Sequence, residues 1–315
     1  MERSNTYYYA NKSIFGAEGD FITAPEISQI FGEMVGIWLL LQCEKYATTT
    51  PHIIELGPGR GTLMKDILRV FKRYPHYRPN IHLVETSQNL QDIQKKILLP
   101  STHSISWHKD FPKIMGPTFI IANEFFDALP LQQYFFQYHQ WHEVHVNYDE
   151  AFHIVFSPVD QKDLPINADE GAFFETSPAS HHYAKKIADY LHHHGGAALL
   201  IDYGDYIPQN RFGETFQALS QHRYVNPFDY LGEADLTYQV DFAALDSLFK
   251  KYSLATHFST QRDFLKAHGF EERLSKILST CSDASIKKDQ YIRAQRLVHP
   301  EAMGQLFKAL EIFKI

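Results

Sequence analysis

The sequence predicts an α/β protein built on one mostly parallel sheet with helices on both faces. Short apolar runs alternate with helical patterns through the first half of the chain. Those runs are almost wholly hydrophobic, which is typical of strands that are buried on both sides. The first run ends in a glycine-rich turn that opens a helix, as happens at the carboxyl edge of such a sheet.

The first-half elements follow in order. An apolar strand at 51–56 reaches the glycine turn, and a helix is expected over Thr62–Tyr74 because its apolar residues share one face. A strand at 80–85 precedes a helix at 87–98 that the Ser87 side chain can cap. Two further strands lie at 104–108 and 118–124. The apolar helix face comprises Leu63, Ile67, Val70 and Phe71.

The second half is less regular. Residues 132–157 alternate and are rich in aromatic side chains, which predicts antiparallel strands. A helix over Pro178–His194 should end at the following glycine pair, and a core strand should follow at 198–204. Asp241 is the expected N-cap of a later helix, and helices with one or two strands complete the chain.

These elements predict a single domain over residues 1–315. Because the sheet pattern accounts for only about half of the chain, the remainder is expected to surround one site. Two segments, 132–176 and 205–240, are expected to be substrate-cap insertions. The second is rich in glycine, proline and aromatic residues, as functional loops often are.

The composition is that of an ordinary globular protein. Its 315 residues carry 30 Lys+Arg against 37 Asp+Glu, a formal net charge of −7. The pI near 6.2 argues against a nucleic-acid partner. Aromatic residues make up 14%, which argues against disorder. Cys43 and Cys281 form no C-x-x-C pair, so neither a disulfide framework nor a cysteine-built zinc site is expected.

The longest apolar run, Ile37–Leu41, lies inside the stretch Ile30–Cys43, which also contains Glu33. Crossing a membrane takes roughly 20 apolar residues, so we expect a core helix here and no membrane insertion. The N-terminal residues lack the apolar segment of a secretory leader and an arginine-rich presequence. The expected location is therefore the bacterial cytoplasm, or the mitochondrial matrix if the source is eukaryotic.

The strongest chemical signal is the turn between Glu55 and the helix at Thr62. Its glycines let the backbone approach a ligand, and the helix offers free N–H groups. A dinucleotide or S-adenosyl-L-methionine (SAM) can use such a turn. The dinucleotide pattern needs its third glycine five positions after the first, whereas Gly61 lies four after Gly57. Glu55 would oppose a pyrophosphate but suits the ammonium and sulfonium of SAM. The expected SAM-binding residues here are Glu55, Gly57, Pro58, Gly59 and Gly61.

Polar side chains also follow the next three strands at the same expected edge. Glu85, with Thr86 after it, can accept hydrogen bonds from both ribose hydroxyls. Asp110 and Phe111 suit the adenine amino group and ring, and Asn123 ends the fourth strand. The alternative is an ordinary tight turn with surface acids. Four strand ends in order favour a cofactor crevice over that alternative.

The sequence contains six ordered blocks: GDFITAPEISQIFGE, ELGPGRGTLMKDILR, HLVETSQNL, ANEFFDALPLQQY, LLIDYG and GEADLTYQVDFAAL. With the late block RLVHPEAMGQLFKAL, they resemble the MidA family of class I SAM-dependent methyltransferases from about Tyr7 to Leu310. The resemblance implies a Rossmann-like sheet with a final antiparallel strand and SAM as cofactor. It also implies methylation of a protein arginine, on the quinone-site subunit of respiratory complex I.

Two features near the N-terminus bear on the resemblance: a departure from the family and a segment with two interpretations. Family members usually carry a further segment before the Tyr-Tyr motif, so contacts from that segment are expected to be absent or supplied otherwise. In GDFITAPEIS, Asp20, Thr23 and Glu26 can close over the cofactor as a lid. Alternatively, Pro25 simply begins the next helix, with Thr23 or Ala24 in its cap region. The resemblance favours cofactor contact by Thr23 and Glu26.

Methyl transfer to arginine needs positioning of a guanidinium that is protonated at neutral pH. Carboxylates can hold it in a fork and take the proton. Glu124 and Asp127 follow the fourth strand, so we expect them to be catalytic, with Glu233 and Asp235 next. The alternative is that Asp127 only caps a helix and Glu124 is a surface acid.

Other clusters are assigned no chemistry. Adjacent histidines at 181–182 and 192–194 point to different faces of a helix, so no metal site is expected. The aromatic stretch Tyr134–Trp141 is expected to pack, although it could line a substrate groove.

Three rival functions remain: methylation of another acceptor, a non-catalytic complex I assembly chaperone, and a nicotinamide dehydrogenase.

Overall fold

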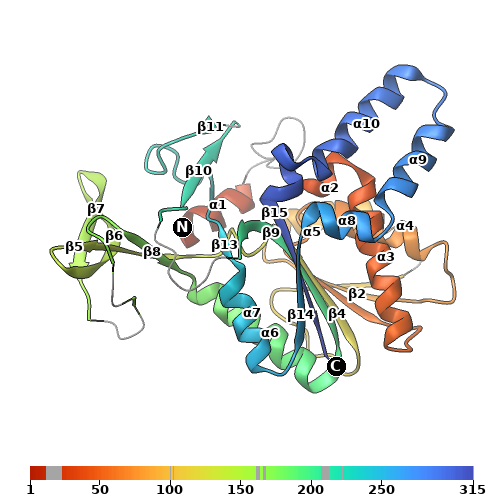
Figure 1. The fold of residues 1–315 in the computed structure, drawn as a ribbon, viewed down its shortest axis with the longest axis horizontal. Coiled ribbons are helices and arrows are strands. Elements are labelled where there is room, and N and C mark those ends of the chain that lie inside the picture. Colours follow the sequence, from red (N-terminus) through yellow and green to blue (C-terminus); the bar gives the residue numbers. More distant parts are fainter. Residues whose placement is uncertain are drawn as a thin grey trace.

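The computed structural model describes residues 1–11, 23–99, 101, 103–160, 164–165, 168–206, 213–221 and 223–314. Asp20 lies outside the described residues. A large twisted sheet forms the centre of the molecule, helices cover both of its faces, and two small sheets lie at one side (Figure 1).

The central sheet has the order β14-β15-β9-β4-β1-β2-β3. Five strands are parallel: β9 (Gly196–Asp205), β4 (Thr118–Asn123), β1 (His52–Leu56), β2 (Asn80–Val84) and β3 (Ser104–His108). The strand β15 (Phe307–Phe313) runs antiparallel to β9 and to β14 (Ala255–Thr260). The short β13 (Val240–Asp241) pairs with the end of β9. The predicted fold class, with its final antiparallel strand, is confirmed.

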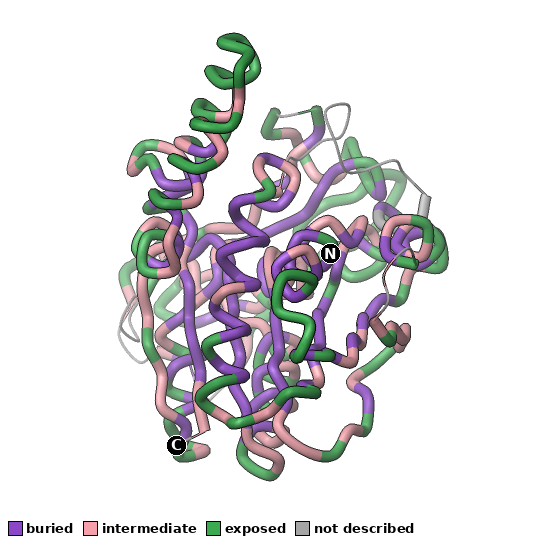
Figure 2. Tube along the Cα trace, turned by 90° about the vertical axis from the view of Figure 1, so that its right-hand side faces the viewer, coloured by how far each residue is buried: buried purple, intermediate pink, exposed green. Residues whose placement is uncertain are grey.

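Both faces of the sheet are buried, which explains the continuous apolar runs. Ile53 of β1 faces one hydrophobic cluster and Ile54 faces the other. The first cluster lies under helices α3 (Gln29–Lys45), α4 (Thr62–Phe71), α5 (Gln88–Leu98) and α8 (Gln261–Ala267). The second lies under α6 (Pro178–His194) and α7 (Phe242–Lys251). Buried residues accordingly concentrate in the central strands and the helices beside them (Figure 2).

The predicted helix ends are largely confirmed. The Ser87 hydroxyl accepts a hydrogen bond from the Leu90 N–H at 3.4 Å, and Asp241 accepts from the Ala244 N–H at 3.0 Å. The helix α6 has the predicted bounds. The helix α4 ends at Phe71, earlier than the predicted Tyr74, because a residue before proline disfavours the helical conformation and Pro75 follows Tyr74.

The apolar stretch near residue 37 is a core helix, as predicted. Glu33 of α3 is buried, and Arg273 of α9 (Phe270–Thr280) donates to both of its oxygens at 2.5 and 2.8 Å. This bidentate pair satisfies the one charge on the buried face of α3. Within the described part of the chain, no helix is long and apolar enough to cross a membrane.

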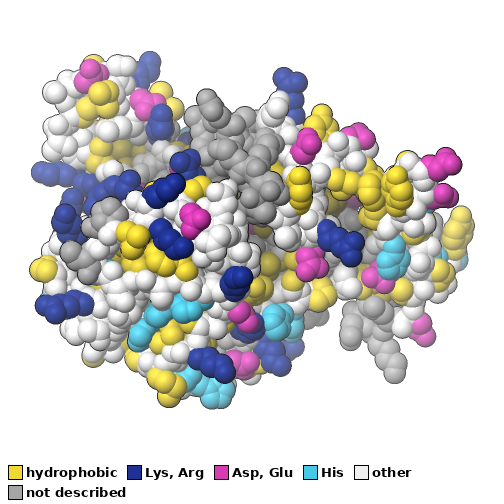
Figure 3. Space-filling model, turned by 180° about the vertical axis from the view of Figure 1, so that it is seen from behind, with side chains coloured by type: hydrophobic (Ala, Val, Ile, Leu, Met, Phe, Trp, Pro, Cys, Tyr) yellow, Lys and Arg dark blue, Asp and Glu magenta, His cyan; other side chains and the backbone are white. Residues whose placement is uncertain are grey.

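Residues 132–176 form a separate antiparallel sheet in the order β7-β6-β5-β8. Its strands are β5 (Gln132–Gln137), β6 (Gln140–Asp149), β7 (Ala151–Pro158) and β8 (Phe173–Thr176). Tyr134 and Trp141 pack with Leu164 in a small core, so the packing interpretation of the aromatic stretch is the one that applies to them. Apolar side chains of β6 and β7 remain exposed at this end of the molecule (Figure 3).

The remaining elements complete the surface. A second small sheet has the order β11-β10-β12, from β10 (Gln217–Ser220), β11 (Arg223–Tyr224) and β12 (Asp235–Thr237). The helices α9 and α10 (Ala284–Val298) form a hairpin that projects from the body (Figure 1), and a short π-helix (Pro300–Gly304) follows. At the N-terminus, α1 (Glu2–Asn11) and α2 (Ala24–Ile27) lie near the carboxyl ends of the parallel strands.

Candidate active site

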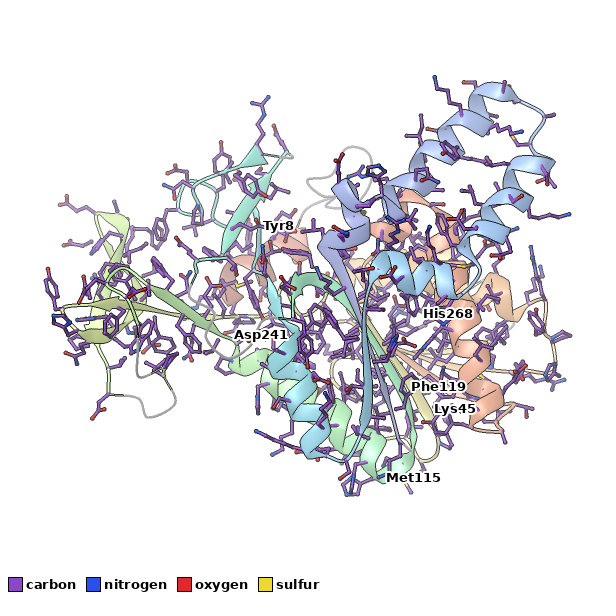
Figure 4. All side chains as sticks on the ribbon, viewed as in Figure 1. Tyr8, Lys45, Met115, Phe119, Asp241 and His268 are labelled. Carbon is purple, nitrogen blue, oxygen red and sulfur yellow. The ribbon has the colours of Figure 1, made fainter. Side chains whose placement is uncertain are left out.

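A cavity of about 470 Å³ lies at the carboxyl ends of the parallel strands. Met115 precedes β4 at the opposite end of the sheet, whereas Tyr8 of α1 lies near this carboxyl end (Figure 4). Twelve of the predicted site residues line the cavity: Thr23, Glu26, Glu55, Gly57, Pro58, Gly59, Glu85, Thr86, Asn123, Glu124, Asp127 and Asp235. Four do not: Gly61, Asp110, Phe111 and Glu233.

The glycine turn needs glycine for conformational and steric reasons. Gly57, Gly59 and Gly61 have φ values of +60°, +52° and +85°, in the left-handed region that other residues rarely adopt. A Cβ on Gly57 would lie 2.8 Å from the Phe125 ring. Gly61 does not line the cavity but occupies the N-cap position of α4. The turn thus brings bare backbone and a helix N-terminus to the cavity.

Glu55, at the end of β1, is buried and its Oε2 has no hydrogen-bond partner. Burial raises the pKa of this carboxyl to about 8. A buried carboxylate is stable only near a cation or hydrogen-bond donors. Its environment therefore fits a ligand that brings a positive charge to the glycine turn.

Glu85, after β2, is held by its neighbours. Its Oε1 accepts from the Ser87 N–H at 2.8 Å, and Gln94 donates to its Oε2 at 3.4 Å. Burial raises the pKa of Glu85, and these donors oppose the rise. Gln94 also donates to the Gly59 carbonyl at 2.7 Å, so one amide joins the glycine turn to the carboxylate expected to bind ribose.

Asp110 and Phe111, the predicted adenine-binding residues, do not line the cavity. Asp110 is largely exposed, and Lys186 of α6 donates to it at 2.7 Å, which lowers the pKa of that carboxyl. Phe111 packs against Tyr190 in the layer beneath α6. Lys109, the residue directly after β3, does line the cavity.

Glu124 is half-buried and lines the cavity. It follows β4 in the left-handed conformation, with φ +49°, and its N–H donates to the Ile201 carbonyl at 2.9 Å. Its Oε1 accepts from the Ala24 N–H and from Asn123, both at 3.1 Å. Burial, more than the nearby Asp202 and Asp235, raises the pKa of Glu124 to about 8.

Asp127 lies in the same turn and does not cap a helix, since no helix begins in residues 124–130. It is buried, and its Oδ1 has no hydrogen-bond partner. Burial, followed by the charges of Asp202, Asp235 and Glu124, raises its pKa well above the usual range. The structure therefore does not show the helix cap that was the alternative for Asp127, and it places Glu124 in the cavity wall.

Asp202 was missed by the sequence analysis, although it lies in the block LLIDYG. Its Oδ2 accepts from the N–H groups of Phe125, Phe126 and Asp127 at 3.2, 3.0 and 3.2 Å, and its Oδ1 accepts from Tyr203 at 2.9 Å. A lone acid at the end of an apolar core strand was the available signal. Asp202 holds the turn that presents Glu124 and Asp127.

The two acids predicted on the second insertion, Glu233 and Asp235, lie in different environments. Asp235 of β12 is buried and lines the cavity, whereas Glu233 is exposed and lies outside it. They are separated by Ala234, which is buried in the small core of that sheet. The catalytic expectation for Glu233 is therefore not supported.

The described residues before α3 show the predicted helix start, and cofactor contact by Thr23 and Glu26 stays a prediction. Thr23 precedes α2 without a capping hydrogen bond from its side chain, and a proline begins that helix. Thr23 and Glu26 also line the cavity, and the Thr62 hydroxyl of the glycine turn donates to Glu26. The helix α2 therefore lies directly over the turn.

The helix α1 was not predicted to reach the site. Glu2, Asn5 and Thr6 line the cavity, and Asn5 is buried. Sequence alone offered little signal, because α1 is polar and short.

The cavity has a strong excess of acceptors. Its described lining includes the acids Glu2, Glu26, Glu55, Glu85, Glu124, Asp127 and Asp235 but only the bases Arg60 and Lys109. Within the described part of the chain, four buried acceptor oxygens around it have no hydrogen-bond partner, on Asn5, Glu55, Asn123 and Asp127. Such a lining favours cationic ligands that carry many donors. Among the residues that the structure describes, no three His, Cys, Asp or Glu side chains are arranged to hold a metal ion.

Comparisons with known proteins agree with this geometry. A family model described as "Putative S-adenosyl-L-methionine-dependent methyltransferase" matches residues 34–260. The Caenorhabditis elegans protein named protein arginine methyltransferase NDUFAF7 homolog, mitochondrial, is 34% identical over 96% of this chain and 77% of its own length. Human NDUFAF7, named a mitochondrial protein arginine methyltransferase, is 32% identical over 95% of this chain and 75% of its own.

Two crystal structures from Burkholderia thailandensis, of proteins in one superfamily, share the fold. One holds S-adenosyl-homocysteine, has 24% identity and a TM-score of 0.85, and aligns over 98% of this chain and 83% of its own. The other, solved in its native form, has 25% identity and a TM-score of 0.84, over 99% of this chain and 87% of its own. These TM-scores and coverages show that the structural similarity extends beyond the central sheet to nearly the whole chain.

Proposed function

Because this chain belongs to the family of S-adenosyl-L-methionine-dependent methyltransferases, we propose that it methylates an arginine side chain of a protein. One observation carries the choice of acceptor: Glu124, Asp127 and Asp235 line one cavity together with the glycine turn, and Asp127 and Asp235 are buried. The names of the C. elegans and human relatives support the same acceptor.

The residues around the turn fit SAM, which supplies a methyl group on a positively charged sulfur. Glu55 and Asn123 each have a buried oxygen without a partner, and these oxygens would accept from the ammonium of the methionine moiety. The helix N-terminus at α4 suits its carboxylate. Glu85 would accept from the ribose hydroxyls. The lining thus offers a matching group for the ammonium, the carboxylate and the ribose hydroxyls of the cofactor.

We assign the binding of the substrate guanidinium, which is the methyl acceptor, to Glu124 and Asp127. A guanidinium carries five N–H donors in a fixed plane, and paired carboxylates bind it with defined geometry. Asp202 fixes both acids through the backbone of the turn between them. Holding the guanidinium still, with one nitrogen toward the methyl group, supplies much of the rate acceleration.

In the transfer, a guanidinium nitrogen forms the new C–N bond while the S–C bond breaks, and the electron pair of that bond stays on sulfur. The nitrogen also loses one proton, so methylarginine remains a cation and one proton is released overall. Glu124 is the proposed proton acceptor. Its Oε1 already accepts two N–H donors, which leaves Oε2 for the substrate. Burial raises its pKa to about 8, so in the empty site this carboxyl keeps its proton at pH 7. The positive charge of a bound guanidinium favours the ionised form of Glu124, which can accept the proton.

The proposed protein substrate is a subunit of respiratory complex I, the quinone-site subunit in particular. This proposal rests on the family resemblance and on the NDUFAF7 relatives. Those relatives are mitochondrial by name, and for a bacterial source we propose the cytoplasm as the location of this chain.

The function can be tested by incubating the protein with methyl-labelled SAM and fractionated cell proteins, followed by amino-acid analysis of the labelled species. Label in methylarginine supports the proposal. Label in another residue or in a small amine identifies a methyltransferase with a different acceptor. SAM binding by calorimetry without any label transfer favours a chaperone role, and NAD binding in place of SAM would indicate a dehydrogenase.

A further inference from the structure

We propose that Asn5 of α1 is a specificity-determining residue of the acceptor half of the cavity, where its side-chain oxygen accepts a hydrogen bond from the guanidinium of the substrate. The inference rests on the proposed function, because it assumes an arginine acceptor. It deepens that function by adding a neutral acceptor to the carboxylates, on an element that no sequence motif assigned to the site.

The orientation of the Asn5 amide is fixed by its donors. Its Nδ2 donates to the carbonyl of Ala128 and to the carbonyl of Leu236, each at 3.0 Å. Only the NH2 end of an amide can serve two carbonyls, so the other end must be the oxygen. Asn5 is 6% exposed, which leaves that orientation little freedom to change.

Among the residues that the structure describes, no donor serves the Asn5 side-chain oxygen. That oxygen is buried, and the residue lines the cavity. A buried carbonyl oxygen normally accepts at least one hydrogen bond, and leaving it unpaired costs free energy. Since the Asn5 NH2 group already donates to two carbonyls, the oxygen is the group that is left to accept a donor from a ligand.

The position of Asn5 indicates which ligand. Ala128 follows Asp127, and Leu236 follows Asp235, so the amide is held between the two backbone segments that carry these carboxylates. A donor that reaches the Asn5 oxygen therefore lies close to buried acids as well. A guanidinium has five N–H donors and can serve a fork of carboxylates and an amide together, whereas an ammonium has three on a single nitrogen.

The helix α1 has other attachments, which allow a matched control. Ser4 accepts from the Gly232 N–H at 2.8 Å. A Cβ on Gly232 would lie 2.5 Å from the Tyr7 ring, so glycine is needed for this close contact. Tyr8 is fully buried. Ser4→Ala thus weakens the attachment of α1 without touching the Asn5 oxygen.

The test compares Asn5→Leu, Asn5→Asp and Ser4→Ala with the wild type. Leucine has the same branching at Cγ but no polar atom, whereas aspartate keeps an acceptor and loses both donor bonds. Calorimetry in the presence of S-adenosyl-homocysteine measures the affinity for two peptides that differ only in Arg or Lys. Turnover with SAM is measured separately, so that binding of the guanidinium and the methyl transfer are judged independently.

Asn5→Leu should weaken binding of the arginine peptide roughly 10- to 100-fold, as expected for one hydrogen bond to a charged group. It should weaken the lysine peptide less and leave SAM affinity unchanged. Asn5→Asp should recover much of the loss, and Ser4→Ala should bind like the wild type. Equal losses in all three variants, or no loss in Asn5→Leu, would overturn the inference. Wild-type protein that binds the arginine peptide but methylates no arginine would refute the proposed function alone, whereas failure to bind it would overturn both.

Discussion

Replacing Glu55 by glutamine should stabilise the ligand-free protein at neutral pH and lower its affinity for SAM. Burial raises the pKa of Glu55 from an ordinary value of 4.5 to about 8. In the empty pocket the folded protein therefore keeps the proton at pH 7, whereas the unfolded chain has lost it. Because the folded-state pKa is the higher one, this group's contribution to stability is complete below about pH 4.5 and is lost as the pH rises toward 8.

The size of the effect follows from the same values. Each factor of ten in proton affinity corresponds to ~1.4 kcal/mol, so ionisation in the unfolded state costs the native state about 3 kcal/mol at pH 7. Glutamine is neutral at every pH and nearly the same shape. The difference in free energy of unfolding, Glu55→Gln minus wild type, should therefore rise by about 3 kcal/mol between about pH 5 and about pH 8.

Urea-induced unfolding of both ligand-free proteins at several pH values measures this difference. Glu124, Asp202 and Asp66 also have raised pKa values, but their contributions are common to both proteins and cancel. Calorimetry should show the opposite order for SAM, with Glu55→Gln binding more weakly by roughly 10- to 100-fold. Parallel stability curves with unchanged SAM affinity would refute the assignment of Glu55 to the ammonium.

Three further changes test other parts of the site. Glu124→Gln should lower kcat by roughly 10²- to 10⁴-fold with SAM affinity unchanged. The control Glu233→Gln, which lies outside the cavity, should behave as the wild type. Equal steady-state rates of Glu124→Gln and the wild type would contradict a catalytic role for Glu124. Asp202→Asn should destabilise the protein by about 2 kcal/mol in urea unfolding and lower turnover more than SAM affinity, because the turn at 124–127 loses its charged acceptor. Gly57→Ala should weaken SAM binding at least tenfold in calorimetry, because its Cβ would lie 2.8 Å from Phe125; normal binding would contradict the close approach of cofactor and turn.

Local sequence patterns predicted the strands of the central sheet and the N-caps of the helices well. The strands β1 and β4 are buried on both faces, so their sequences contain little besides apolar residues and leave an unmistakable signal. Ser87 and Asp241 cap helices because short polar side chains accept from nearby N–H groups, a purely local interaction. The glycine turn was equally local, since its positive φ values require glycine.

Residues that depend on distant contacts were predicted less well. Asp110 follows β3 as expected, but Lys186 of α6 pairs with it and Asp110 does not line the cavity. Asp202 and Asn5 act through hydrogen bonds to backbone groups far away in sequence, and no spacing rule reports such contacts. Between Glu233 and Asp235, only the three-dimensional pairing of β12 decides which acid faces the cavity.

The central claim is tested most directly by mass spectrometry of two peptides, identical except for one Arg or Lys, after incubation with the protein and SAM. The proposed function predicts a mass gain of one or more methyl groups, located by fragmentation on arginine, with none on lysine and a large loss of rate in Glu124→Gln. Methylation of the lysine peptide alone, or arginine methylation at an unchanged rate in Glu124→Gln, would contradict the account.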